Sequence, residues 1–206
     1  MAADKEHELT IGGARFRVRD AGQGEAVIWL GGSLPPALGA RLVERGRVIE
    51  LHSSETSMAD ARAIGDAVAS LGVDRFAIIA QGDTAPVALR LALQMPQALR
   101  AVAMLGPRLI AANGEAAAAI DPALVAQLAS IKAPCLAIFG TKDECAPPEA
   151  ARYYRARIPG CNLIFVYDAT EAMARERPEA VAELLLDFLD RGDHFIVRRE
   201  EDLLYP

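Results

Sequence analysis

The chain has 206 residues, of which 52% are hydrophobic and 24% charged, a composition typical of one globular domain with a sizeable core. Its net charge of −6 argues against nucleic acid and anionic membranes as partners, because both require clustered lysine and arginine. The start of the chain lacks the pattern of a signal peptide and no apolar run reaches the roughly 18 residues of a membrane span, so we expect a cytoplasmic protein.

Three short strands are predicted at the start of the chain, the first two forming a hairpin across Gly12-Gly13. From there apolar runs alternate with helical patterns. Strands are predicted within residues 7–13, 14–22, 26–32, 47–51, 75–80, 99–105, 135–140 and 162–167, and helices within 57–72, 85–96, 111–131, 147–160 and 178–192. This alternation predicts an α/β fold, a three-layer α/β/α sandwich around a mostly parallel sheet of about eight strands.

The last predicted helix carries an apolar stripe that we expect to dock on the sheet, formed by Val181, Leu184, Leu185 and Phe188. Gly192 is its predicted C-cap. We predict a single domain over residues 1–190 and a C-terminal tail over residues 191–206. The tail joins an apolar triplet, a charge cluster and the sequence LLY, which is typical of a segment that binds another subunit, as in a homo-oligomer, or folds back on its own domain.

Three cysteines, Cys135, Cys145 and Cys161, lack CxxC spacing. Their number and spacing argue against a disulfide framework and against a zinc site. We expect buried, reduced thiols, and we predict no metal and no cofactor.

Three long segments, residues 15–33, 71–107 and 131–189, resemble the α/β-hydrolase family over nearly the whole chain. In order, they are similar to its opening strands and oxyanion loop, its G-x-S-x-G nucleophile elbow, and its C-terminal acid and histidine segments. The resemblance implies an α/β-hydrolase sheet. The cap domain is expected to be minimal or absent, because only residues 107–131 are available for it, and residues 31–42 are expected to be a short loop.

The resemblance places Gly82 where the nucleophilic serine stands, whether the pattern is registered from Asp74 or from Pro96. Ala80 and Thr84 occupy the positions of the flanking elbow glycines. Since the elbow backbone is strained and needs small residues, Thr84 is expected to fit poorly and the turn to be relaxed.

Asp83 is an alternative nucleophile, as in members that resemble dehalogenases and epoxide hydrolases, but this needs a shift of one residue. We favour Asp83 as the residue after the nucleophile position, with its backbone N–H facing the oxyanion site. The turn Gly31-Gly32 and the N–H of Ser33 are candidates for the rest of that site. A simple turn at the end of the strand explains these glycines equally well.

By the same resemblance, Asp143 matches the family's acid, while Glu171 stands where the histidine should be and Thr170 replaces its glycine. If Glu171 and Asp143 face each other in a poorly solvated site, one of them should be protonated and the pair could act as acid and base. The favoured alternative is that Glu171 is solvated or paired with Arg175.

His52 follows a predicted strand whose end should open on the edge of the sheet that carries the elbow, beside Ser53 and Ser54. It could serve as a base there, although a polar loop histidine is the favoured interpretation. Cys145 is a further candidate nucleophile, but we expect a packed thiol.

Two functions from different classes follow. The first is a degenerate α/β-hydrolase without serine-hydrolase activity, retained to bind a partner or an unidentified small molecule, because a triad without serine and histidine loses several orders of magnitude in rate. The alternative is an active hydrolase or lyase on small ester-like substrates, built on Asp83, Asp143, Glu171 and His52. A third possibility, an obligate partner of another enzyme, requires an exposed apolar patch in the tail.

Overall fold

The computed structural model describes residues 5–53, 61–110 and 121–195. The strands in these ranges are β1 (Lys5–Ile11), β2 (Ala14–Ala21), β3 (Ala26–Leu30), β4 (Arg47–Ser53), β5 (Phe76–Gln81), β6 (Leu99–Leu105), β7 (Cys135–Gly140) and β8 (Asn162–Val166). The helices are α1 (Pro36–Val43), α2 (Ala61–Ser70), α3 (Ala85–Gln94), α4 (Pro122–Gln127), α5 (Ala151–Arg157), α6 (Met173–Glu176) and α7 (Pro178–Arg191). A 3₁₀ turn, Gly82–Thr84, joins β5 to α3.

The strands form an eight-stranded sheet in the order β1-β2-β4-β3-β5-β6-β7-β8 within the described ranges. β1 and β2 pair antiparallel as the predicted hairpin, and β2 also pairs antiparallel with β4. All other pairs are parallel. The carboxyl ends of β3, β4, β5, β6, β7 and β8 therefore meet at one edge of the sheet, where binding sites of open α/β sheets form.

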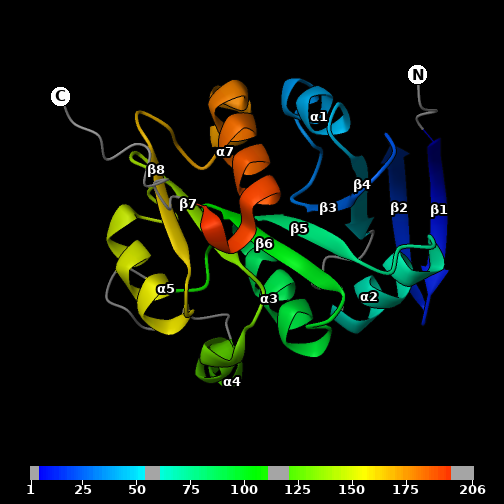
Figure 1. Ribbon diagram of the computed structural model, residues 1–206, viewed down its shortest axis with the longest axis horizontal. Coiled ribbons are helices and arrows are strands. Elements are labelled where there is room, and N and C mark those ends of the chain that lie inside the picture. The colour runs from blue at the N-terminus through cyan, green and yellow to red at the C-terminus, as the bar shows by residue number, and fades with distance from the viewer. Residues whose placement is uncertain (1–4, 54–60, 111–120, 196–206) are drawn as a thin grey trace.

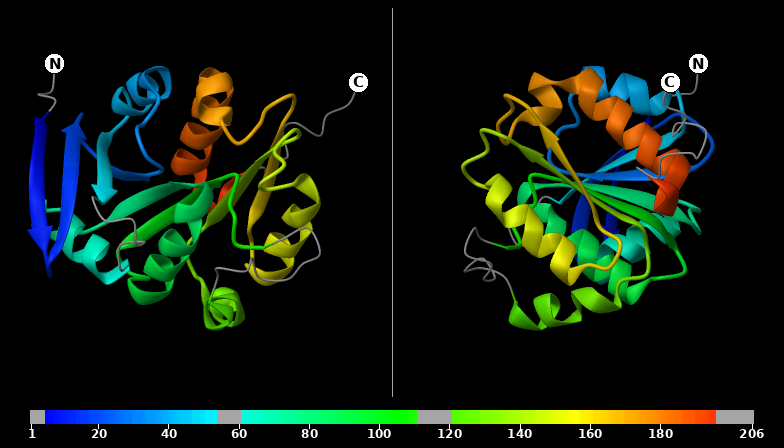
Figure 2. Two further views of the ribbon diagram at one scale, coloured as in Figure 1. Left: turned by 180° about the vertical axis from the view of Figure 1, so that it is seen from behind. Right: turned by 60° about the vertical axis from the view of Figure 1, so that its left-hand side comes forward.

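Helices cover both faces of the sheet, as Figures 1 and 2 show. One buried cluster includes Ile64, Leu89 and Tyr154 from α2, α3 and α5. The other includes Leu38 and Phe188 from α1 and α7, which pack together on the opposite face. The predicted three-layer sandwich is thus confirmed.

The uninterrupted apolar run of β5 follows from this arrangement. Successive side chains of a strand point to opposite faces. Phe76 and Ile78 accordingly lie in one cluster, while Ala77 and Ile79 lie in the other. Because both faces are covered by helices, no position of the strand has to be polar.

Two helices were not predicted. Residues 31–42 were expected to be a loop, but α1 begins at Pro36, and Leu38 and Leu42, four residues apart, bury one face against α7. The proline supplies a helix-compatible φ at the first position, which is the signal the loop interpretation overlooked. The short α6 is stabilised by Thr170, which lies before the helix. Glu176, the last residue of α6, accepts hydrogen bonds from the N–H and hydroxyl of Thr170 at 2.8 and 2.7 Å.

The last helix agrees with its sequence pattern. Val181, Leu185 and Phe188 are fully buried, and Leu184 is partly buried against them. Gly192 has a φ of +54° and donates its N–H to the carbonyl of Phe188, the expected C-cap. The packed chain continues beyond α7, because Phe195 is buried against Phe188 with ring centroids 5.5 Å apart.

Two expectations about side chains and connections can also be compared with the structure. Cys135 and Cys161 are buried and in no disulfide, as expected, but Cys145 is exposed, so the expectation of a packed thiol there was wrong. Between β6 and β7 the described chain contains α4 and one short 3₁₀ turn, Leu128–Ser130, in keeping with a minimal cap. None of the described helices has both the length and the apolar character needed to cross a membrane.

The end of β7 generates a stability prediction. A Cβ on Gly140 would lie 2.3 Å from the carbonyl oxygen of Ala169, in the loop after β8. Gly140→Ala is expected to lower the free energy of unfolding by about 2 kcal/mol, because backbone must move to admit the methyl group. Gly12→Ala is the control for strain without a clash, since Gly12 has a φ of +58° and open space, and should cost about 1 kcal/mol. Equal losses in urea unfolding would contradict the prediction.

Candidate functional site

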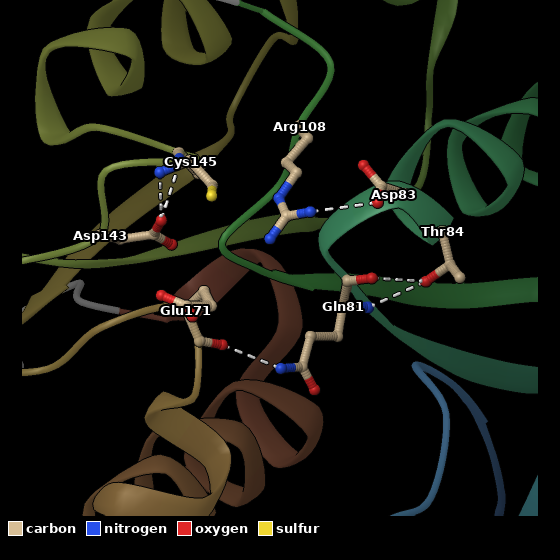
Figure 3. Close-up of polar contacts among 8 residues, drawn as sticks. Gln81, Asp83, Thr84, Arg108, Asp143, Cys145 and Glu171 are labelled. Atoms are coloured by element: carbon tan, nitrogen blue, oxygen red, sulfur yellow. Dashed lines mark hydrogen bonds and ion pairs between the residues drawn. The ribbon is translucent and has the colours of Figure 1, made fainter.

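The elbow between β5 and α3 keeps its sharp geometry. Gly82 has a φ of +58°, the left-handed conformation that glycine adopts without strain. Thr84 does not disturb the turn, contrary to expectation: its hydroxyl donates to the carbonyl of Leu30 at 2.6 Å and accepts the N–H of Gln81 at 3.0 Å. Figure 3 shows the Gln81 contact. The turn is therefore tied to the end of β3 and is not relaxed.

Arg108 lies directly above this turn. A Cβ on Gly82 would lie 3.8 Å from both Cζ and Nε of Arg108, so the guanidinium occupies space next to the nucleophile position. Its Nη1 contacts Oδ2 of Asp83 at 3.1 Å, as Figure 3 shows. Asp83 is exposed, so this pair contributes little to stability. Nε of Arg108 is buried and has no hydrogen-bond partner among the described residues.

Tyr154 fixes the loop that carries Arg108. Its hydroxyl, on the buried side of α5, donates to the carbonyl of Pro107 at 2.6 Å. It accepts the N–H groups of Leu109 and Ile110 at 2.8 and 3.1 Å. Burial raises the pKa of the Tyr154 hydroxyl, so it stays protonated and keeps donating. The N–H of Arg108 also donates to the carbonyl of Gly82 at 3.3 Å, which couples this loop to the elbow.

Asp143 lies at the end of β7 and is only 2% exposed. Its Oδ1 accepts the N–H groups of Cys145 and Ala146 at 2.9 and 2.8 Å, which fixes the side chain within its own turn. Its Oδ2 has no hydrogen-bond partner among the described residues. A Cβ on Gly106 would lie 2.7 Å from this oxygen. The buried carboxylate thus points its free oxygen toward Gly106, which lines the cleft at the elbow.

A small cleft of about 250 Å³ opens at the elbow. Glu171, from the loop after β8, shares this cleft with Gly82, Asp83 and Arg108. Glu171 is exposed, and its carbonyl accepts the side-chain N–H of Gln81 at 3.0 Å. It is therefore not in the poorly solvated environment that a proton-sharing pair with Asp143 requires.

His52 lies in a different and larger cleft of about 540 Å³, formed over β1, β2 and β4. Ser33 lines the same cleft, whereas Gly31 lines the cleft at the elbow. Gly32 has a φ of +73° and its carbonyl accepts the indole N–H of Trp29 at 2.9 Å. His52 and Ser33 thus line a cleft whose lining does not include Gly82, and Ser54 lies outside the described residues. The oxyanion roles of Gly32 and Ser33 stay predictions.

A buried carboxylate, Glu50, organises this larger cleft. Its two oxygens accept the N–H of Leu34 at 3.0 Å and a guanidinium N–H of Arg19 at 3.1 Å, and Nε2 of His52 lies 3.6 Å away. Burial works to raise the pKa of Glu50, but His52, the Leu34 N–H and Arg19 together outweigh it, and the net pKa is lowered. Glu50 stays ionised and holds the loop after β3 against β4.

Among the described residues that line it, the elbow cleft offers one cation, Arg108, and two exposed carboxylates, Asp83 and Glu171. These residues include no serine, cysteine or histidine, and the hydroxyl of Thr84 is engaged by backbone groups. Sequence reasoning located Gly82, Asp83, Asp143 and Glu171 but missed Arg108, whose only local signal is its place just after β6. It also missed Glu50, because a carboxylate inside an apolar run is a signal only once its partners are known. Among the described residues, no group of three or more His, Cys, Asp or Glu side chains could hold a metal ion.

Comparisons with known proteins agree with the fold described above. No family model matches the chain. It is 35% identical over 65 residues to the pimeloyl-[acyl-carrier protein] methyl ester esterase of Neisseria meningitidis serogroup B, a match that covers 32% of this chain and 25% of that esterase. A predicted CIB-like hydrolase from Thermoplasma acidophilum superposes with a TM-score of 0.75 at 19% identity, covering 92% of this chain and 99% of the other. The carboxylesterase CesB from Bacillus subtilis gives 0.74 at 15% identity, with 91% and 92% covered.

The Glu50 network generates a prediction on pH. A carboxylate whose folded pKa lies below its ordinary value of 4.5 gives stability that is complete above that pH and is lost as the pH falls through the folded pKa. Glu50→Gln is therefore expected to lower the free energy of unfolding by about 2 kcal/mol at neutral pH, and the two proteins should converge as the pH falls below 4.5. Glu25→Gln, which removes an exposed pair with Arg100, is the control and should change little. A difference that stays constant with pH would refute the assignment.

Proposed function

This chain has the α/β-hydrolase fold, and on that premise we propose that it uses the elbow cleft of the fold to bind a small polar molecule and does not hydrolyse esters. The observation that carries the proposal is the guanidinium of Arg108 above Gly82. The position that a hydrolase uses for attack holds a glycine here, and a fixed cation takes the adjoining space.

The lack of a nucleophile is the first support. Gly82 keeps the backbone of the elbow but carries no hydroxyl, and Asp83 next to it is engaged by Arg108 at 3.1 Å. In a triad whose members act as a unit, loss of the nucleophile or of the histidine removes most of the roughly 10⁶-fold contribution to kcat. Among the described residues that line this cleft, there is neither a serine at the tip of the turn nor a histidine.

The state of Asp143 is the second support. In a triad the acid orients the histidine through a hydrogen bond to Nδ1. Here Oδ1 of Asp143 is used within its own turn and Oδ2 points at Gly106 without a hydrogen-bond partner among the described residues. Glu171, at the histidine position, is an acceptor like Asp143 when both are ionised and cannot replace the imidazole N–H.

The chemistry of the ligand follows from the groups left open. Nε of Arg108 is a buried donor without a described acceptor, and such a group favours a ligand that supplies a carbonyl or carboxylate oxygen. Glu171 at the cleft rim can accept a hydrogen bond from the same ligand. The cleft volume of about 250 Å³ limits the bound part to a few heavy atoms. A small amide or amino-acid-like group satisfies both requirements.

Ester hydrolysis provides the first test. The purified protein is incubated with a panel of short activated esters beside Asp143→Ala, Glu171→Ala and His52→Ala variants. We expect no turnover by the wild-type protein above the three variants, because no described group at the elbow can form an acyl intermediate.

Each other outcome has a distinct meaning. Turnover that both Asp143→Ala and Glu171→Ala abolish would replace the binding proposal with a carboxylate-based enzyme. Turnover that only His52→Ala abolishes would move the chemistry to the larger cleft.

Binding is tested with acetamide and acetate as probes, followed through the Nε–H signal of Arg108 in ¹H–¹⁵N spectra. A saturable shift in the millimolar range is expected for at least one probe. The amide signals of Gly82 and Gly106 should shift with it in wild type and not in Arg108→Ala. Arg90→Ala, which removes an exposed pair with Asp121, is the control and should bind as wild type does. Equal shifts in wild type and Arg108→Ala would contradict the proposed role of Arg108.

A further inference from the structure

Phe165 and Tyr167 are the large hydrophobic side chains that the described part of the chain leaves in solvent, and they are 49% and 84% exposed. Phe165 belongs to β8, and Tyr167 follows directly after this strand. The ring of Phe165 contacts that of Phe139, with centroids 6.1 Å apart, yet about half of its side chain stays in water. Exposed aromatic side chains gathered at one place mark an interaction surface.

β8 and β1 are the edge strands of the sheet within the described ranges, at opposite ends of it in Figure 1. An edge strand presents unpaired N–H and C=O groups, and proteins protect such edges with charged residues or proline. β1 carries three charged residues, Lys5, Glu6 and Glu8. β8, with the sequence NLIFV, has no charged residue and no proline. The edge at β8 is therefore the one suited to pairing with another strand.

The contact with β7 shows which main-chain groups of β8 face outward. The carbonyl of Val166 accepts the N–H of Thr141, directly after β7, at 3.1 Å. Because successive residues of a strand direct these groups to opposite edges, Leu163 and Phe165 point theirs away from the sheet. The same alternation continues to Tyr167. The outward main-chain groups thus belong to the residues that carry the exposed aromatic side chains.

An antiparallel copy of the same strand satisfies these groups when Phe165 lies opposite Phe165 of the second copy. In such a pair the two residues exchange both N–H···O=C bonds, with Cα atoms about 5.5 Å apart. Leu163 then lies opposite Tyr167 of the second copy, and the reverse, so about six main-chain hydrogen bonds form. A two-fold axis at Val166 would lose the pairs of Leu163, because Asp168, with a φ of +59°, ends the extended backbone.

α7 runs antiparallel to β8 along a groove of about 690 Å³. Arg177, at the start of this groove, contacts Asp168 just after β8 at 3.4 Å. At the other end, a Cβ on Gly192 would lie 3.7 Å from Pro134, which directly precedes β7, and the first residues of β7 and β8 are neighbours in the sheet. The acidic residues of α7 that line the groove therefore lie nearer the amino end of β8: Glu183 and Asp187.

The charges along this groove favour an antiparallel copy. Arg177 and Lys142 share Asp168 at the carboxyl end of β8, which leaves one surplus positive charge there. Toward the amino end, Arg191 pairs with Asp187, and Glu183 leaves one surplus negative charge. A two-fold axis places the positive end of each copy beside the negative end of the other, whereas a parallel copy would bring like charges together.

We propose that two copies of this chain pair through β8, antiparallel about a two-fold axis at Phe165, and form a dimer with one continuous sheet. On the α5 face Phe165 packs against Phe165 of the second copy and Tyr167 covers its Leu163. On the α7 face Ile164 lies opposite Val166 of the second copy. The contact is isologous, so it closes at two chains, and it is small, so the dimer is reversible.

The dimer rests on described residues alone, because residues 196–206 of the predicted tail lie outside them. The homo-oligomer that the sequence analysis connects with the tail is thus assigned to β8. This assignment does not depend on the function proposed for the elbow cleft.

Exchanging charges at Phe165 tests the proposal by sedimentation of the full-length protein. Wild type is expected to be a dimer that dissociates on dilution. Phe165→Lys and Phe165→Glu each place like charges opposite each other across the axis, so each alone should be monomeric. An equimolar mixture of the two should associate at least about tenfold more tightly than either variant alone, because lysine then faces glutamate.

Thr10→Lys, an exposed substitution on the edge strand β1, is the control and should stay as dimeric as wild type. Circular dichroism shows that each variant is folded. A wild-type protein that remains monomeric, a Phe165→Lys variant that remains dimeric, or a mixture that associates no more tightly than its components overturns the proposal.

Hydrogen exchange gives an independent readout on the wild-type protein. The outward amides of Leu163, Phe165 and Tyr167 should exchange at least about tenfold more slowly well above the dissociation constant of the dimer than well below it. The amides of Ile164 and Val166, which face β7, should not vary with concentration. Outward amides that are protected equally at all concentrations would identify a segment of the same chain as the cover and overturn the dimer.

Discussion

The turn from β5 into α3 sets the geometry on which the rest of the elbow site depends. Its backbone is held by the left-handed conformation of Gly82 and by the Thr84 hydroxyl, which ties the turn to the end of β3. Because β5 is central in the sheet, neighbouring loops must fit around this turn. The carbonyl of Gly82 accepts the N–H of Arg108 from the loop after β6, and the Gln81 side chain reaches the carbonyl of Glu171 from the loop after β8.

The same frame that suits acyl transfer therefore holds a different set of groups. The hydroxyl of Tyr154 makes three hydrogen bonds to the loop after β6, and these position Arg108 in the absence of a ligand. A preorganised donor loses little freedom on binding, which favours recognition. Asp143 uses one carboxylate oxygen to accept two N–H groups of its own turn. This arrangement supports the binding function that we propose for the site.

The parts of this structure that could be predicted from the sequence are those with local signals. The run of β5 is continuously apolar, the stripe on α7 is periodic, and the hairpin turn carries two glycines, so each predicts its element without knowledge of the neighbours. α1 was missed because its amphipathic pattern is short and its stability comes from α7, far along the chain. The residues of the candidate site show the same difference between local signals and contacts across the fold. Gly82 and Glu171 could be placed by registering motifs, whereas the positions of Arg108 over the elbow and of His52 beside Glu50 depend on contacts between distant segments.

The glycine at the tip of the elbow also makes the stability cost of a substitution there depend on its direction, to glycine or away from it. Any side chain at a φ of +58° costs about 1–2 kcal/mol in backbone strain, a sizeable share of the roughly 5–15 kcal/mol that holds a typical domain folded. A chain with glycine there is relieved of that strain, and restoring a hydroxyl would lower stability before any histidine could make it reactive. If the cleft binds a ligand as we propose, exchange of a nucleophile for glycine at this position is energetically downhill and the reverse exchange uphill.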